Sequence, residues 1–149
     1  MSTLDFAEIF EYIVAPLSIG EAEKPNNLVY VNKAYCDLTG YSPEELIGKN
    51  PGKLLQLEPY TKTREAMREK LDKKESIDVL VKNYRKNGTL FWNGLHIHPV
   101  IDNTGACIYW VGMANDVTQF VQEVDARLEA IISTMKDSFQ HMSKDLDKI

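Results

Sequence analysis

The sequence feature that most constrains the fold is an Asn87-Gly88 pair between two segments of strand-forming residues. Both residues tolerate the positive φ angles that a tight turn between antiparallel strands requires. The pair therefore predicts a β-hairpin over residues 83–93. Asn83 precedes the turn and Asn93 follows it, so each strand carries one carboxamide. If both face the same side, they place two donors and two acceptors in one pocket, which suits a flat ring bearing heteroatoms.

Five segments carry the pattern of β-strands. Apolar and polar residues alternate over 77–83 and again over 93–99, as in strands with one buried face. Strand-forming residues also occupy 14–19, 28–31 and 106–114. The sequence therefore predicts one antiparallel sheet.

Helix signals cluster between the second and third predicted strands. Asn32 is a typical N-cap and Gly40 a typical helix end. The Ser-Pro-Glu-Glu segment at 42–45 combines an N-cap, an early proline and acidic residues. We expect one further helical turn over 53–56 and a longer helix over 60–74. Together these elements predict an α+β fold, a five-stranded antiparallel sheet with short helices on one face.

The end of the chain follows a different pattern. After Val117, apolar residues recur at intervals of three and four, at 121, 124, 128, 131, 135, 139, 142, 146 and 149. This is a heptad seam with one extra residue near Met135. A single helix cannot bury such a stripe, so we expect a parallel coiled coil and a homodimer. The alternative is that the helix folds back on the sheet.

Composition limits the classes of partner and compartment. The chain has 149 residues, 44% of them apolar, which is enough for one core. The net charge of −5 and the absence of a basic patch argue against nucleic acid or a membrane surface as a partner. Without a membrane-spanning run or a secretion signal, we expect a cytoplasmic location. Cys36 and Cys107 form neither a metal-ligand spacing nor a disulfide framework.

No motif predicts an enzyme. The chain lacks a nucleophile elbow, a phosphate-binding loop and a plausible pair of catalytic carboxylates. His96 and His98 share one strand face and could bind a metal or haem iron, but no third ligand is near, and we expect them on the outer face of the sheet. Residues 139–146 faintly resemble the phosphoacceptor box of histidine kinases, with Lys144 where the phosphorylated histidine would stand.

Several short segments together resemble the PAS domain family and, within it, the light-oxygen-voltage (LOV) branch. These segments are 29–35, 38–42, 44–50, 83–89, 91–93 and 116–118. The resemblance implies a sensory domain whose sheet and helices enclose a pocket and which signals through flanking helices. We therefore divide the chain into an N-terminal amphipathic helix or cap at 1–15, a PAS domain at 16–118 and a signalling helix at 119–149.

The resemblance also implies a flavin, FMN or FAD, but without the photoactive cysteine. LOV domains place that cysteine where this chain has Pro51, which has no nucleophile. Gly52 and then Lys53 follow, where the branch has a phosphate-binding arginine. Ala114 stands in place of the glutamine that reads the protonation state of the flavin, and alanine can neither donate nor accept a hydrogen bond. A retained flavin would therefore not form an adduct at Pro51.

Five residues match the flavin contacts of the branch. Asn83 and Asn93 match the asparagines at the ring edge, Asn50 and Gln56 resemble the ribityl contacts, and Arg64 matches a phosphate-binding arginine. Gln56 lies one residue late, and the segment from Gln56 to Arg64 is shorter than in photosensors. The pocket could instead hold another small ligand, or the core could be packed.

Signal coupling is expected at Ala114, Asp116 and Thr118, where the last strand meets the long helix. Asp116 or Thr118 could cap the start of that helix. A change in the pocket would then reach the helical dimer and a downstream effector domain or protein. The alternative function is a cofactor-free scaffold for dimerisation or partner binding. A void with unpaired carboxamides would favour a ligand, and a packed interior would favour the scaffold.

Overall fold

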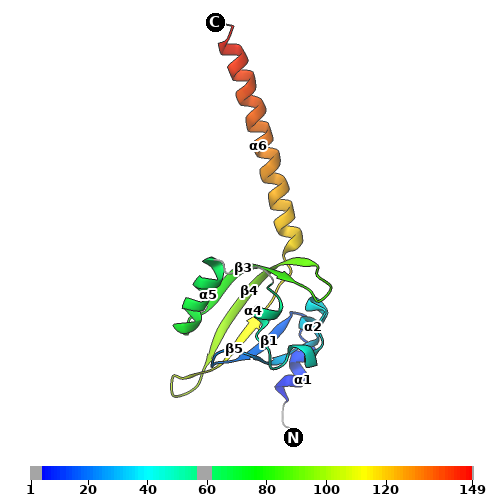
Figure 1. Ribbon diagram of the computed structural model, residues 1–149, viewed down its shortest axis with the longest axis vertical. Coiled ribbons are helices and arrows are strands. Elements are labelled where there is room, and N and C mark those ends of the chain that lie inside the picture. The colour runs from blue at the N-terminus through cyan, green and yellow to red at the C-terminus, as the bar shows by residue number, and fades with distance from the viewer. Residues whose placement is uncertain (1–4, 57–61, 149) are drawn as a thin grey trace. The chain divides into compact units, whose positions relative to one another are not determined.

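The computed structural model describes residues 5–56 and 62–148, which belong to two compact units, Met1–Asp116 and Val117–Ile149. Figure 1 shows a sheet and short helices in the first unit and one long helix in the second. No helix among the described residues is long and apolar enough to cross a membrane.

The first unit is built on an antiparallel sheet, as predicted. Its spatial order is β2-β1-β5-β4-β3, with the strands β1 (Leu17–Glu21), β2 (Leu28–Val31), β3 (Ile77–Tyr84), β4 (Leu90–Ile101) and β5 (Cys107–Met113). The predicted start of the first strand at Val14 is wrong. Val14 is 91% exposed, and Pro16 has no N–H to donate to a neighbouring strand.

Local capping signals set the helices between β2 and β3. α2 (Lys33–Thr39) begins after Asn32, whose side chain accepts from the Tyr35 amide, and ends at Gly40 with φ +77°. α3 (Pro43–Leu46) begins with a complete capping box at Ser42. Both starts confirm the prediction.

The start of one helix differs from the prediction, and the predicted start of another lies outside the described residues. α4 (Pro51–Leu54) begins two residues earlier than expected, because the Asn50 side chain caps it and Pro51 occupies its first turn. α5 (Lys62–Asp72) lies within the predicted helix; the predicted start at residue 60 is outside the described residues.

A short N-terminal helix is attached to the sheet by Asn32 and by Tyr30 of β2, whose hydroxyl donates to the Ala7 carbonyl and to the Glu11 carboxylate. α1 (Phe6–Glu11) is capped by Asp5. Asn32 is completely buried and donates to the carbonyls of Phe10, Ile13 and Ala15. Its oxygen accepts from the amides of Leu17 and Tyr35. The Asn32 side chain therefore joins the end of α1 and the segment after it to β1 and α2.

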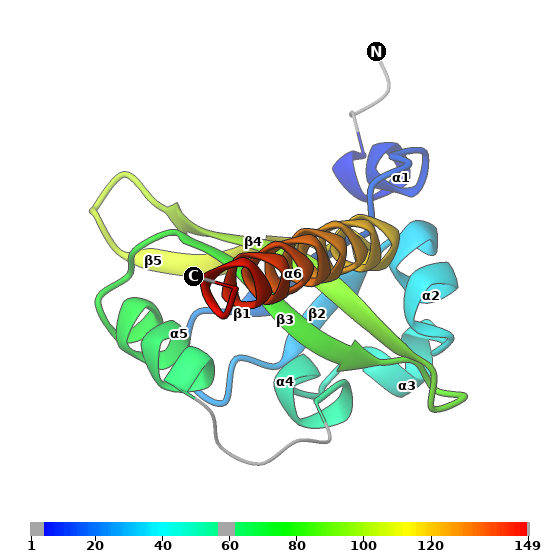
Figure 2. The ribbon, with the colours of Figure 1, turned by 90° about the horizontal axis from the view of Figure 1, so that it is seen from above.

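Apolar side chains from the sheet and helices form one core. Tyr35, Leu46 and Leu55 pack with two β2 residues and with Ala114. Figure 2 shows α2, α3 and α4 following one another beside the sheet. This arrangement matches the predicted α+β fold with helices gathered on one face.

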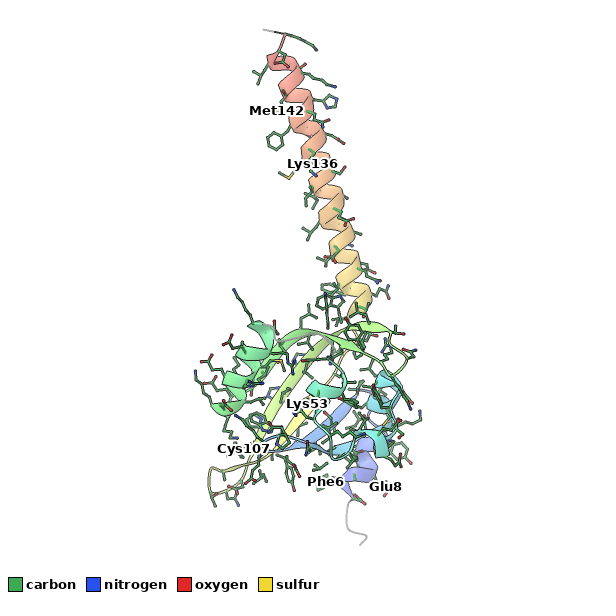
Figure 3. All side chains as sticks on the ribbon, viewed as in Figure 1. Phe6, Glu8, Lys53, Cys107, Lys136 and Met142 are labelled. Carbon is green, nitrogen blue, oxygen red and sulfur yellow. The ribbon has the colours of Figure 1, made fainter. Side chains whose placement is uncertain are left out.

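The second unit is α6 (Thr118–Leu146), a single helix of 29 residues. Most of its predicted seam is exposed in this single chain; Leu128, Ile131, Met135, Phe139, Met142 and Leu146 are each more than half exposed, and Val121 is half-buried. Figure 3 shows the Met142 side chain projecting from the helix. Ile149, the last predicted seam residue, lies outside the described residues, and the predicted dimer stays a prediction.

Candidate functional site

The first unit contains a cavity of about 490 Å³ between the sheet and α4 and α5. This volume lies in the range of small-molecule pockets in proteins. Its apolar wall comes from both layers, with Leu28, Tyr35, Leu55, Met67, Leu71, Leu95, Ile97 and Trp110. The fold therefore leaves room for a ligand and surrounds it with apolar side chains.

The cavity brings together five residues that are far apart in the sequence. Every residue predicted to contact a cofactor lines it: Asn50, Gln56, Arg64, Asn83 and Asn93. They come from α4 and its flanks, from α5, and from the two strands of the central hairpin. The cofactor-binding role of these residues stays a prediction, but they share one pocket.

The two hairpin asparagines point to the same side, which meets the condition that the sequence left open. Each is 3% exposed, and Asn93 Nδ2 donates to Asn83 Oδ1 at 2.9 Å. Asn83 Nδ2 donates to the Lys82 carbonyl at 3.0 Å, and Asn93 Oδ1 accepts from the Asn115 amide at 3.0 Å. Each carboxamide keeps one N–H and one oxygen lone pair beyond these bonds. The pocket thus combines a void, which favours a ligand, with carboxamides that already pair.

Cationic side chains stand at another part of the pocket wall. Arg64 and Arg68 lie one helical turn apart on α5, and Lys53 lies on α4. Lys24 also lines the pocket and pairs with Asp72 at 2.7 Å. Arg64 was assigned from the sequence but Arg68 was not; the i, i+4 spacing places both arginines on one face of α5, and the packing of α5 shows that this face lines the cavity. These groups suit an anionic substituent on the ligand.

Pro51 also lines the pocket, at the first position of α4. Neither cysteine lines it among the described residues: Cys36 lies in α2 and Cys107 at the start of β5. Figure 3 shows Cys107 near the β4–β5 turn. Burial raises the pKa of the Cys36 thiol, which favours its neutral form.

Asn50 already has structural partners. Its oxygen accepts from the Lys53 amide at 3.3 Å, and its nitrogen donates to the Pro25 carbonyl. The sequence predicts Asn50 only as a ribityl contact and does not predict this cap of α4. Trp110, also not foreseen, contributes a wall residue whose buried Nε1 has no hydrogen-bond partner among the described residues.

The predicted coupling residues occupy three different environments. Ala114 is 4% exposed and belongs to the core. The Asp116 carboxylate pairs with Arg85 at 2.6 Å. Thr118 is the first residue of α6, and the N-cap position is Val117, which makes no side-chain cap. A role of Asp116 or Thr118 in coupling stays a prediction.

The two histidines of β4 lie away from the pocket. They alternate along the strand with Leu95 and Ile97, which line it, and both are exposed. His96 Nδ1 lies 2.5 Å from an Asp78 carboxylate oxygen and thereby lowers the pKa of Asp78. His98 Nδ1 lies 3.0 Å from the Ser76 hydroxyl. Among the described residues no group of three or more potential ligands could hold a metal ion.

Comparisons with known proteins agree with this geometry. A family model for the PAS domain matches residues 18–119. The chain is 41% identical over 100 residues to a blue-light photoreceptor of Listeria innocua, covering 64% of this chain and 38% of that protein. It is 30% identical over 146 residues to phototropin-1A of Oryza sativa, covering 96% of this chain and 16% of that protein. The chain thus spans well under two thirds of the length of these relatives.

Solved structures give the same assignment. An RNA-binding light-oxygen-voltage receptor matches with a TM-score of 0.77 at 30% identity, covering 85% of this chain and 36% of that chain. The LOV domain of a blue-light activated histidine kinase from Erythrobacter litoralis matches with a TM-score of 0.66 at 30% identity, covering 71% of this chain and 98% of that domain. Because the family model spans most of the chain and a complete LOV domain aligns with it, this chain belongs to the PAS domain family and resembles its LOV branch.

Proposed function

We propose that the chain is the sensory module of a signal-transduction protein, which holds a flavin in its pocket and passes changes there to a dimeric helix. The observation that carries this proposal is the single cavity that gathers Asn50, Gln56, Arg64, Asn83 and Asn93. The LOV-type relatives support it, since one of the matching structures is a LOV domain studied with a flavin analogue. Light, redox state or a small ligand could each be the stimulus.

The described residues fit a flavin in chemical type. The free N–H groups and lone pairs of Asn83 and Asn93 would bind the polar edge of the ring, and the apolar wall would cover its faces. Arg64 and Arg68 offer forked donors to the phosphate of FMN or FAD. Asn50 and Gln56 would contact the ribityl chain. A bound flavin would supply visible absorption and redox chemistry.

The proposal includes binding without a covalent bond to a cysteine. Pro51 contributes no nucleophile to the wall, and neither Cys36 nor Cys107 lines the described pocket. Illumination of the flavin-loaded protein would therefore produce no cysteine adduct.

The output side of the proposal is a parallel homodimer formed by α6. The exposed apolar seam of this helix is long enough for a coiled coil. The chain itself has no proposed catalytic role, and a downstream effector domain or protein would receive the signal. Cysteine crosslinking at Val124 and Met142, with and without ligand, reports whether the pairing of the two helices changes.

A second candidate function is a cofactor-free scaffold, and one observation favours it. Asn93 donates directly to Asn83, so part of the hydrogen-bonding capacity of the two carboxamides is used without a ligand. In this case the cavity would hold water, and α6 would serve dimerisation or partner binding alone.

The deciding experiment is an absorption spectrum of the purified protein, followed by titration with FMN. We expect saturable binding, weakened about tenfold or more in Asn93→Leu because the substitution removes the polar edge contact. His96→Ala is the matched control, since His96 is exposed on the same strand but faces away from the cavity. Absence of saturable FMN binding would reject the flavin proposal and leave another small ligand or the scaffold.

A further inference from the structure

A tyrosine of α2 lines the cavity with a hydroxyl that has no hydrogen-bond partner. Tyr35 belongs to the cavity wall and is only 4% exposed. Its amide and its carbonyl both pair with side chains, whereas no described group pairs with its hydroxyl. Because nearly all buried polar groups in proteins are satisfied, an open one in a cavity wall points to a ligand.

The Tyr35 hydroxyl opens into the cavity and is not enclosed by protein atoms. Among the described residues, the fully enclosed side-chain polar atom without a partner is Trp110 Nε1. The Tyr35 hydroxyl is not enclosed in this way, although almost all of the side chain is buried. Since Tyr35 lines the cavity, the surface that its hydroxyl keeps lies there.

Neighbouring side chains fix the position of Tyr35 on the helix. The Tyr35 amide donates to the Asn32 side chain at 3.0 Å, and the Thr39 hydroxyl donates to the Tyr35 carbonyl at 2.9 Å. Asn32 and Thr39 are themselves buried. Lys33 and Asp37 form an exposed ion pair on the other face of α2. The helix therefore presents Tyr35 to the interior, with every polar group of the residue satisfied except the hydroxyl.

The surroundings of the hydroxyl define the acceptor that it can bind. Burial raises the pKa of Tyr35, so the phenol keeps its proton and can donate a hydrogen bond. Leu28 and Leu55 belong to the same core cluster as Tyr35 and line the same cavity. An anionic acceptor is costly to bury beside apolar side chains, whereas a neutral carbonyl oxygen or ring nitrogen is not.

The position of the hydroxyl also makes it selective. A ligand that displaces water from this part of the cavity must offer the hydroxyl an acceptor, or the buried hydroxyl loses its hydrogen bond. Phenylalanine would fill the same space without this requirement. Tyr35 therefore distinguishes a ring that carries an acceptor toward α2 from a ring of similar shape that does not.

We propose that Tyr35 is a ligand-recognition residue whose hydroxyl donates to a neutral carbonyl oxygen or ring nitrogen of the bound ring. Asn83 and Asn93 hold the polar edge of that ring from the sheet, and Tyr35 adds a polar contact from the helix layer. The ligand class is therefore a heteroaromatic ring with acceptors toward both the hairpin and α2. This inference rests on the proposed function, since it takes that ring to be a flavin.

Titration of the full chain with FMN tests the contact. Tyr35→Phe keeps the aromatic ring and removes the hydroxyl, so the dissociation constant for FMN should rise about fivefold or more, because a buried acceptor of the ligand loses its donor. Tyr109→Phe is the matched control, since Tyr109 is 44% exposed on β5 and does not line the described cavity. The control should bind FMN within about twofold of wild type. Equal binding by the wild type and Tyr35→Phe would overturn the proposal.

Riboflavin separates a contact to the ring from a contact to the phosphate, because it carries the same ring without the phosphate. Tyr35→Phe should weaken the binding of riboflavin and of FMN by the same factor, within about twofold. A loss that is confined to FMN would place the hydroxyl against the phosphate, and that result overturns the assignment to a neutral acceptor of the ring.

Thermal unfolding without ligand tests whether the hydroxyl lacks a partner in the protein. Tyr35→Phe should raise the melting temperature or leave it within about 3 °C of wild type, because no protein hydrogen bond is lost. A larger fall would show that the hydroxyl has a protein partner and would overturn the proposal. Failure of the wild type to bind either flavin overturns the proposed function together with this inference. Flavin binding that is insensitive to Tyr35→Phe overturns this inference alone.

Discussion

Replacing Asn32 by alanine should destabilise the protein more than any other single asparagine change outside the pocket. The oxygen of this completely buried side chain accepts from two backbone amides, and its two N–H groups are shared among three backbone carbonyls, so it contacts α1 and its flank, β1 and α2. Loss of the α2 cap costs about 1 kcal/mol. The unpaired buried Leu17 amide adds about 1 to 3 kcal/mol. The bonds to the carbonyls of Phe10, Ile13 and Ala15 are partly buried, and water can take over part of their bonding.

The expected loss in the free energy of unfolding is therefore about 2 to 4 kcal/mol. For a chain of this size, that loss corresponds to a fall in melting temperature of roughly 5 to 15 °C. Urea unfolding followed by circular dichroism measures it, with Asn103→Ala as the control because Asn103 lies exposed in the β4–β5 turn. Asn32→Asp keeps the acceptor and loses the donors, so it should retain the α2 cap. A loss below about 1 kcal/mol in Asn32→Ala would refute the reasoning, since a cap alone accounts for that much.

Three further predictions concern backbone conformation, pH and assembly. Gly40→Ala should cost about 1 kcal/mol in urea unfolding, because φ is +77° at this position and a Cβ disfavours it; an unchanged midpoint would contradict this. The hydrogen bond from Lys86 lowers the pKa of Glu45 in the folded protein. The stabilisation that this pair gives the fold is therefore fully present above the pKa of Glu45 in the unfolded chain, and it is lost as the pH falls through the lower pKa of Glu45 in the folded protein. In urea unfolding over pH 2.5 to 6, the free energy of unfolding of Lys86→Met should fall less steeply with decreasing pH than that of the wild type. Identical pH slopes would count against the Lys86–Glu45 pair. Leu128→Asp should convert a dimer into a monomer in analytical ultracentrifugation, whereas Glu129→Lys should not; a wild-type monomer would refute the coiled coil.

Local signals in the sequence predicted the features that depend on neighbouring residues. The Asn87-Gly88 turn, the Asn32 cap and the Ser42 capping box were correct because each needs only a few adjacent residues. The alternation of apolar residues predicted the two strands of the hairpin, but the sequence left open whether Asn83 and Asn93 share one side, as they do in the structure. These local signals also predicted the order of strands and helices along the chain, and that order indicated the α+β fold.

Features that depend on distant partners were not predictable in this way. The bond between Asn93 and the Asn115 amide requires the hairpin to meet the end of β5, which no local pattern encodes. Arg68 was passed over because only the packing of α5 shows that it lines the cavity. Asn50 was assigned to a ligand alone, and its cap of α4 became visible only with the Lys53 amide in place.

The extra residue in the α6 seam has a geometric consequence for whatever follows this chain in a longer protein. Between Leu128 and Phe139 the seam advances by eleven residues, four more than one heptad. In a paired helix wound at 3.5 residues per turn, those four residues turn the surface about 50° around the helix axis. A domain fused before this segment and the same domain fused after it would therefore face different directions. The number of residues in a fusion linker thus sets the orientation of the fused domain as well as its distance.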